Sequence, residues 1–225
     1  MNSPRVVVPL ALLAAAIVTT PAHAKSAKVK KATLSWSQTN LYVSGAQLPV
    51  QKTYLGYVVS PTLSPGGTFT PLAGAKGPTV NNASAAGPTS VYTTAFTAKK
   101  GKFDAKKVKG SISFKGIVEF KNSLFTTTVE NPKIVLKGKT GQLFASGKSS
   151  STAAPTYSNK PLLNLDLKTA KISKKKTKLT IKGIVPSIAT ADLAFPANYI
   201  VGAGPDRTPN TFGSFSFTVS LKKSK

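Results

Sequence analysis

The chain contains no cysteine and only one histidine, His23, among its 225 residues. Without cysteine it forms no disulfide, so its stability has to come from the packed core. Zinc sites use Cys or His in nearly every case, and Ser-His-Asp and Cys-His nucleophile systems need a histidine base. These kinds of chemistry are therefore excluded beyond residue 23, and we expect a protein that is not an enzyme.

Acidic residues and arginine are also scarce. Six Asp and Glu face 31 Lys and Arg, the formal net charge is +25, and the only arginines are Arg5 and Arg207. Arginine supplies the planar fork that reads bases in the major groove, whereas lysine is a strongly hydrated point charge. We therefore expect no sequence-specific binding of nucleic acid. A lysine-rich surface fits an anionic wall polymer or membrane surface, and it equally fits a surface that is merely solvated.

Residues 1–24 have the parts of a signal peptide. Arg5 supplies the positive start, residues 6–18 form an apolar run, and Ala22-His23-Ala24 is an A-x-A-like cleavage site. The run is shorter than the roughly 20 residues that a membrane-spanning helix needs. We expect cleavage after Ala24 and a secreted or envelope-associated protein, and the alternative, an uncleaved N-terminal anchor, is less favoured. The mature chain would then contain neither His nor Cys.

The rest of the chain is predicted to form one domain. Residues 25–31, KSAKVKK, are expected to be a basic lead-in with frayed structure, and residues 32–222 are long enough for one all-β unit. Residues 61–90 are rich in Pro, Gly and Ala and contain little that builds a core. We expect this segment to be a long, mobile surface loop.

Alternation of apolar and polar residues is the main structural signal. It is clear at 112–120, 163–167 and 215–221, where successive side chains would point to opposite faces of a strand. After the first of these stretches we expect a turn at residues 121–123. We also expect Asn131-Pro132 to end a second strand, because proline has no N–H for the ladder. The stretch from 110 to 138 is thus predicted to be a meander of three antiparallel strands.

About nine to eleven strands at this spacing favour an all-β fold, specifically a mainly antiparallel β-sandwich. We expect a strand within residues 50–60 and at most one or two short helices, with 186–195 as a candidate. The only tryptophan, Trp36, is expected in the core. So are the inward-facing members of the alternating stretches, namely Phe114, Phe120, Leu165 and Phe217.

Three motifs in order carry a family resemblance. Leu34-Ser35-Trp36 opens the series, GSISFKGIVEF (110–120) and ENPKIVL (130–136) follow, and Phe195, Tyr199 and Gly202 form an F-x-x-x-Y-x-x-G pattern. Together they resemble the Htaa domain of exported actinobacterial haem-uptake proteins, over about residues 32 to 222. One departure is Pro205-Asp206, where that family often has D-P.

The resemblance implies haem as a cofactor. In the family a tyrosine near the first strand ligates the iron, and a histidine just after the glycine of the central strand supports it. Here Tyr42 is the haem-ligand candidate, with Tyr54 and Tyr57 as alternatives, while Gly116-Ile117 stands where the family has Gly-His. A phenolate suits ferric haem, and a supporting partner tunes such a ligand. Tyr42 fits equally well as an aromatic residue at the edge of the core with a solvated hydroxyl.

Two functions follow from these observations. The first is an exported, non-catalytic haem-binding or haem-relay protein of the cell envelope, with haem or haem-carrying envelope proteins as partners. The second is a haem-free envelope module of the same fold that binds anionic wall polymer or lipid through its lysines. Tyr42 and the scaffold favour the first function, and Ile117 favours the second.

Overall fold

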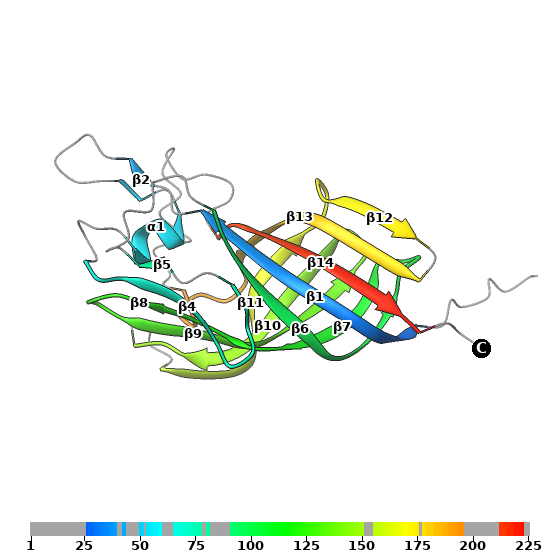
Figure 1. The fold of residues 1–225 in the computed structure, drawn as a ribbon, viewed down its shortest axis with the longest axis horizontal. Helices are drawn as coiled ribbons and strands as arrows, with labels where there is room; N and C mark the ends of the chain where they lie inside the picture. Colours follow the sequence, from blue (N-terminus) through cyan, green and yellow to red (C-terminus); the bar gives the residue numbers. More distant parts are fainter. Residues whose placement is uncertain are drawn as a thin grey trace, which may run out of the picture.

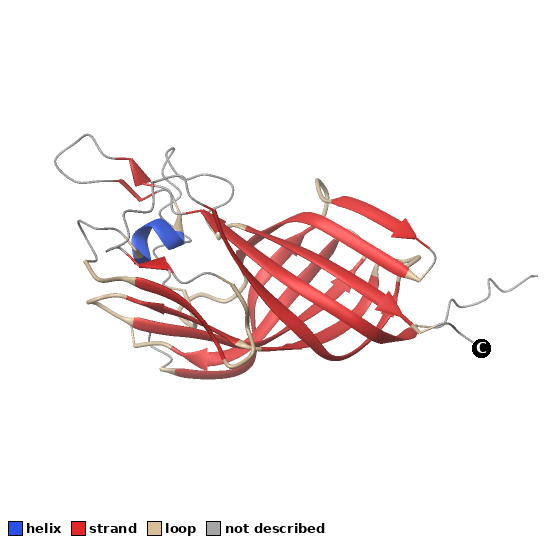
Figure 2. Ribbon diagram, in the orientation of Figure 1, coloured by secondary structure: helices blue, strands red, loops and turns tan. Residues whose placement is uncertain are grey.

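The computed structural model describes residues 26–39, 42–43, 50–51, 53–59, 65–77, 80–81, 91–150, 155–175, 177–195 and 212–222. The predicted signal peptide and residues 196–206 of the closing motif lie outside these ranges. The described elements are almost all strands (Figure 2). In chain order they are β1 (Ala27–Thr39), β2 (Tyr42–Val43), β3 (Val50–Gln51), α1 (Tyr54–Val58), β4 (Thr68–Leu72), β5 (Val80–Asn81), β6 (Val91–Asp104), β7 (Lys109–Lys115), β8 (Ile117–Lys121), β9 (Thr126–Lys137), β10 (Thr140–Lys148), β11 (Thr156–Asp166), β12 (Lys171–Lys175), β13 (Lys178–Ile188) and β14 (Ser214–Leu221). No helix among the described residues is long and apolar enough to cross a membrane.

Eight strands close into an antiparallel barrel (Figure 1). Their order is β10-β11-β13-β14-β1-β6-β7-β9, and the pairing of β9 with β10 completes the circle. β8, β4 and β5 extend from β9, β12 pairs with β13, and β2 and β3 form a separate two-stranded sheet. The prediction of an all-β, antiparallel fold is confirmed. The predicted sandwich is wrong, because alternation reports one buried face and leaves open whether the last strand pairs back onto the sheet.

The side chains expected inside the fold line its core. Phe114, Phe120, Leu165 and Phe217 are each at most 2% exposed, and Trp36 is 1% exposed. Trp36 stacks on Phe215 with ring centroids 5.0 Å apart and meets Phe120 edge-on at 5.7 Å. Aromatic pairs at such separations add to the stabilisation from buried area, so these rings tie β1, β14 and β8 together.

The central stretch departs from the predicted meander. Gly116, with φ of +136°, divides the expected strand into β7, which pairs with β6, and β8, which pairs with β4. A Cβ at this position would lie 2.6 Å from the backbone nitrogen of Ala75, so the close approach requires glycine. Opposite it, Asn131 donates its N–H to the Gly116 carbonyl at 2.7 Å.

Asn131-Pro132 therefore does not end a strand, and β9 continues from Thr126 to Lys137. Its first half pairs with β8 and its second half with β7. Pro132 is tolerated because it falls at the irregularity between these halves, where the ladder is interrupted. The predicted three strands are in fact one long, kinked hairpin. Its turn is as predicted, since Asn122 Oδ1 accepts the N–H groups of Leu124 and Phe125.

Two predicted secondary structures are exchanged. The expected strand within 50–60 contains helix α1, and Thr53 caps it by accepting the Gly56 N–H at 3.0 Å. Conversely, the candidate helix at 186–195 is strand β13 as far as Ile188, followed by turns. Short apolar runs fit the repeat of a helix and the repeat of a strand equally well. Pairing with β11 makes residues 185–188 a strand.

Two expected irregular segments contain strands. The basic lead-in 25–31 is not frayed from Ala27 onward, because β1 begins there and pairs with Phe103 of β6. Within 61–90, residues 68–72 form β4 against β8, so this range is not one continuous loop. Of the same range, residues 61–64, 78–79 and 82–90 lie outside the described parts of the chain.

Candidate functional site

The three tyrosines predicted as haem ligands belong to one segment at one end of the barrel (Figure 1). Tyr42 in β2 pairs with Gln51 in β3, and α1 starts shortly afterwards at Tyr54. Tyr57 lies on the same helix. The fold thus places all three candidates on consecutive short elements. For Tyr42 only the backbone is described, so its predicted role as ligand stays a prediction.

Tyr54 is an integral part of the core. Its side chain is 0% exposed and packs among the rings of Phe120, Phe195 and Phe212, at centroid distances of 5.2, 5.0 and 5.7 Å. For its oxygen to bind iron, this ring would have to leave the cluster or haem would have to enter it. Either change would disrupt the burial of aromatic surface that stabilises the core. The placement therefore favours a packing role for Tyr54.

Tyr57 is more accessible. Its side chain is half-buried and stacks on Phe125, with centroids 5.9 Å apart and ring planes inclined by 15°. A residue with one apolar face packed and part of its surface in solvent can contact a planar ligand without loss of the core. Among the described side chains of the three candidates, Tyr57 is thus better placed than Tyr54 for a binding role.

Two tyrosines that sequence reasoning did not single out are also inside the barrel wall. Tyr157 donates its phenolic hydrogen to the carbonyl of Thr128 at 2.5 Å. Burial raises the pKa of Tyr157 well above its usual range, and the charge of Glu130 adds to this effect. The phenol therefore stays protonated at neutral pH, which makes it unsuitable as a phenolate ligand. Tyr92 is half-buried and pairs with Gln38 of β1.

Two buried polar side chains at this end of β1 and β6 have no hydrogen-bond partner among the described residues. Gln38 is 1% exposed and Thr94 is 0% exposed, and neither the Gln38 amide nor the Thr94 hydroxyl has a partner in the described structure. They are diagonal neighbours on the inner face, since Trp36 pairs with Thr94 and Gln38 pairs with Tyr92. Buried polar groups without a partner are costly and rare. Their presence beside α1 indicates a place where a polar ligand group would be stabilised.

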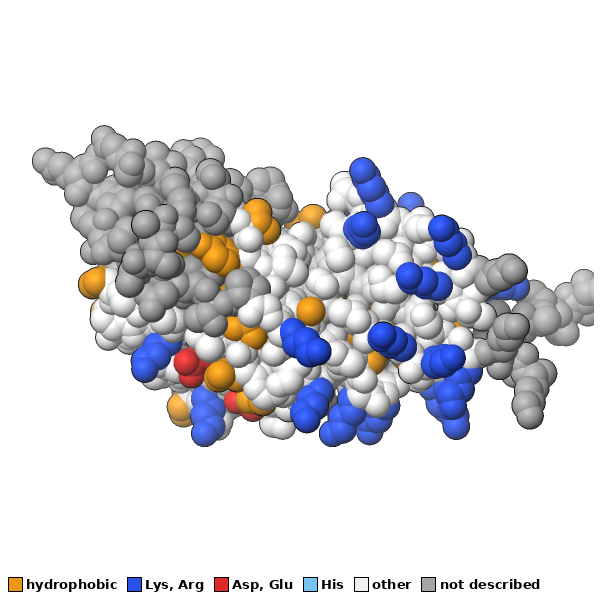
Figure 3. All heavy atoms as spheres, viewed as in Figure 1, with side chains coloured by type: hydrophobic (Ala, Val, Ile, Leu, Met, Phe, Trp, Pro, Cys, Tyr) orange, Lys and Arg blue, Asp and Glu red, His pale blue; other side chains and the backbone are white. Residues whose placement is uncertain are grey.

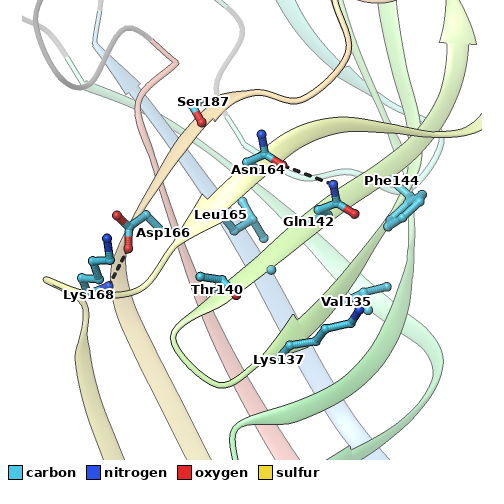
Figure 4. Close-up of a pocket in the computed structure, with 11 residues that line it drawn as sticks. Val135, Lys137, Thr140, Gln142, Phe144, Asn164, Leu165, Asp166, Lys168 and Ser187 are labelled. Carbon is cyan, nitrogen blue, oxygen red and sulfur yellow. Dashed lines mark hydrogen bonds between the residues drawn. The ribbon is translucent and has the colours of Figure 1, made fainter.

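A groove of about 510 Å³ lies on the outside of the barrel over β9, β10 and β11 (Figure 4). Three of its polar side chains are already engaged: Gln142 Nε2 donates to Asn164 Oδ1 at 3.2 Å, and Asp166 Oδ1 accepts the Lys168 N–H at 2.8 Å. The groove holds one carboxylate and no paired acid and base. In the described part of the chain, no three His, Cys, Asp or Glu side chains come together as a metal site. This groove therefore shows no arrangement for hydrolysis or metal binding.

Comparison with known proteins supplies the family. The family model named Htaa matches residues 49–209. The crystal structure of the C-terminal domain of HtaA from Corynebacterium glutamicum is 19% identical with a TM-score of 0.56, covering 88% of this chain and all (100%) of that domain. The N-terminal domain of the same protein is 15% identical with a TM-score of 0.52, covering 87% and 99%.

The haem-binding protein HtaB from the same bacterium is also similar, at 12% identity and a TM-score of 0.47, covering 88% of this chain and 96% of that one. No curated protein matches this sequence. The solved HtaA domains show that the barrel is a shared fold. Because the family model matches most of the sequence, from residue 49 to residue 209, the chain belongs to the Htaa family.

Proposed function

We propose that this protein is an exported, non-catalytic haem-binding or haem-relay protein of the cell envelope. The observation that carries the proposal is the match to the Htaa family over residues 49–209, on a barrel like that of the HtaA domains. Export is inferred from the signal-peptide pattern in residues 1–24. The partners would be haem itself and the envelope proteins that deliver or receive it.

The donors that the chain offers fit ferric haem bound through oxygen. After residue 24 there is no His, Cys or Met, so tyrosine is the common haem-ligating side chain that remains. Bound haem would supply an iron that accepts a phenolate. Tyr42 is our first choice as ligand because of its place in the family pattern, and Tyr57 is the next because it is half-buried on α1.

The surroundings of these tyrosines fit a planar, mostly apolar ligand with a few polar groups. Tyr57 exposes part of a ring that is supported by the buried Phe125, and the inner wall presents Gln38 and Thr94 with no protein partner among the described residues. An amide and a hydroxyl can each donate a hydrogen bond to a carboxylate. These residues would hold the ligand, while the barrel supplies a rigid support.

One difference from the family pattern lowers the expected affinity. Ile117 occupies the place of the supporting histidine, and it is a half-buried residue of β8 paired with Leu72 and Glu130. An isoleucine donates no hydrogen bond and carries no charge, so it cannot orient or charge a tyrosine ligand. We therefore expect haem binding of modest affinity. The haem-free alternative, an envelope module that binds anionic polymer or lipid, is favoured by the same residue.

The test is a haemin titration followed by absorbance, comparing the wild type with Tyr42→Phe, Tyr57→Phe and Tyr157→Phe. The last variant is a matched control, because it makes the same chemical change where the phenol already donates to Thr128. We expect a saturable absorbance change when haemin is added to the wild type. This change should be lost or shifted in Tyr42→Phe, and it should be the same as in the wild type in Tyr157→Phe.

Each other outcome has a defined meaning. If the wild type gives no saturable change, the haem proposal fails and the haem-free module remains. If only Tyr57→Phe abolishes the change, haem binding stands and the ligand is on α1. If all three variants bind as the wild type does, haem binding stands but neither Tyr42 nor Tyr57 is the ligand.

A further inference from the structure

A second groove, of about 590 Å³, lies on the outer face of the barrel and is lined mainly by lysines. Its walls come from β1, β6, β7, β9 and the residue that follows β14. We call it the lysine groove, and its cationic residues are Lys28, Lys99, Lys100, Lys102, Lys133 and Lys222. Figure 3 shows many lysine side chains over the right-hand half of the barrel, while the acidic side chains visible in that view lie toward its left-hand end, beside a few further lysines.

Backbone irregularity helps to bring these lysines together. The register of β6 on β7 shifts between Ala98 and Lys100. In a regular strand, adjacent side chains point to opposite faces, but here Lys99 and Lys100 are both exposed. A bulge of this kind re-aims a side chain. The fold thus adds one lysine to the groove that a regular strand would direct inward.

Pairing across the strands sets the other positions. Lys28 pairs with Lys102 of the neighbouring strand, and Lys222 donates its N–H to the Lys28 carbonyl at 3.0 Å. On the other side, Ser113 pairs with both Lys100 and Lys133. Charges from four segments of the chain therefore face one concave surface, in fixed registers.

The floor of the groove suits anionic oxygens. Gly101 contributes backbone to it. Because Gly101 pairs with the buried Ile112, a side chain at position 101 would point into the core and not into the groove. Ser111 and Ser113 add half-buried hydroxyl groups that can donate hydrogen bonds. Short neutral donors between lysines are a suitable lining for phosphate groups.

No carboxylate lines the lysine groove. The acid nearest along β6, Asp104, is engaged in its own turn, where its Oδ1 accepts the N–H groups of Lys106 and Lys107 at 2.8 and 3.1 Å. The ammonium groups of neighbouring lysines repel one another at separations shorter than the screening length, which is about 8–10 Å. An anion in the groove would remove this repulsion, and the protein supplies none from the residues that line it.

We propose that the lysine groove binds a linear polymer of closely spaced phosphate groups that carries no bases. Lysine attracts phosphate as a point charge and needs no fixed fork geometry, which suits a flexible chain. The lining contains no aromatic ring, and binding of single-stranded nucleic acid relies on such rings for stacking. A concave groove also fits a strand of polymer better than a flat membrane surface.

The experiment measures binding of long-chain inorganic polyphosphate to the purified protein. The groove variant replaces Lys28, Lys99, Lys100 and Lys102 with Gln. The matched control replaces Lys171, Lys175, Lys178 and Lys182 with Gln, which removes the same charge from the exposed residues of the β12–β13 hairpin. We expect the groove variant to bind polyphosphate more weakly by about tenfold or more. The plot of log affinity against log salt concentration should also become shallower by about 3, at about 0.7 for each lost phosphate contact. The control should stay close to the wild type.

Three results would overturn the proposal. Equal losses in the two variants would mean that only the diffuse charge matters. Equally tight binding of orthophosphate would mean a site for a single ion. Tighter, groove-dependent binding of phosphatidylglycerol vesicles would assign the groove to a membrane surface. This proposal does not depend on haem, and a haemin titration of the groove variant that matches the wild type would show the two functions to be separate.

Discussion

At one end of the barrel Trp36, Tyr54 and Phe120 pack ring against ring beneath α1, whereas at the other end six lysines surround a groove on the outer face. The aromatic end contains short elements, and its buried Gln38 and Thr94 side chains have no partner within the described ranges. The lysine end consists of long paired strands and has its polarity on the surface. In the first, ligand contacts would replace contacts of the core, and in the second they would replace only water and counterions. The protein should therefore have to rearrange more to admit a ligand at the aromatic end than at the lysine end.

The core nevertheless runs through both ends. Phe120 contacts Tyr54 and Phe69 at 5.2 Å each at the aromatic end, and Phe217 meets Phe103 edge-on at 5.7 Å nearer the lysine end. Both side chains are at most 1% exposed. Because the barrel is closed and both rings belong to one core cluster, we expect them to unfold as one cooperative unit.

The largest predicted effect tests whether the core unfolds as one cooperative unit. Phe120→Ala and Phe217→Ala should each lower the free energy of unfolding by about 3–5 kcal/mol, because each removes a buried aromatic ring and leaves a cavity. Chemical denaturation followed by tryptophan fluorescence and by circular dichroism measures the change. One shared transition in both variants supports a single core. A separate early transition in Phe120→Ala alone would show that the aromatic end unfolds independently.

The next effect concerns the point where the two ends meet. Gly116→Ala should cost about 2–4 kcal/mol, since it combines backbone strain with crowding against Ala75. Gly138→Ala is the control: Gly138 also has positive φ, at +75°, but nothing lies within 4 Å of its added Cβ. The two variants are compared by urea unfolding. An equal loss in both would show that the contact with Ala75 adds nothing.

A smaller effect should follow from the buried hydrogen bond at the aromatic end. Trp36 Nε1 donates to the Phe212 carbonyl at 2.7 Å. Trp36→Phe keeps a ring in the core but removes this buried hydrogen bond, and the expected loss of stability is about 1–3 kcal/mol. The midpoint of thermal unfolding monitors it. An unchanged midpoint would mean that another donor or water replaces the indole.

The sequence predicts the regular part of this fold well. The alternation from Phe215 to Leu221 matches β14, because a strand with one face in the core and one in solvent repeats every two residues. The barrel closure does not follow from such a pattern, because it depends on the pairing of β9 with β10, for instance Leu143 with Ile134. The kink at Gly116 is likewise a tertiary effect, set by the approach of Ala75.

The candidate sites show the same limit. The count of lysines is visible in the sequence, but only the strand pairing gathers Lys99 and Lys100 with Lys28 and Lys133. The family pattern predicts Tyr42, Tyr54 and Tyr57 as one group. It ranks Tyr42 first but does not distinguish Tyr54 from Tyr57, because the burial of Tyr54 comes from residues as distant as Phe212.

The smallest predicted effect depends on pH and concerns the barrel wall between the two ends. Tyr157→Phe should cost about 1 kcal/mol near neutral pH, because the hydrogen bond to the Thr128 carbonyl is lost. In the folded wild type the pKa of Tyr157 lies above its unfolded value of about 10, chiefly because of burial. The contribution of the neutral phenol is thus complete below about pH 10 and is lost as the pH rises toward the raised pKa, since the unfolded chain releases a proton that the folded chain keeps.

The difference in unfolding free energy between wild type and Tyr157→Phe should therefore narrow from about pH 8 to about pH 11. Urea titrations of both proteins at these two pH values measure it, and the lysines titrate alike in both, so their contribution cancels. A difference that stays constant or widens would show that the phenol ionises in the folded protein as readily as in the unfolded one. In that case Tyr157 would have to be counted among the tyrosines able to supply a phenolate, and the preference for Tyr42 and Tyr57 would lose one of its supports.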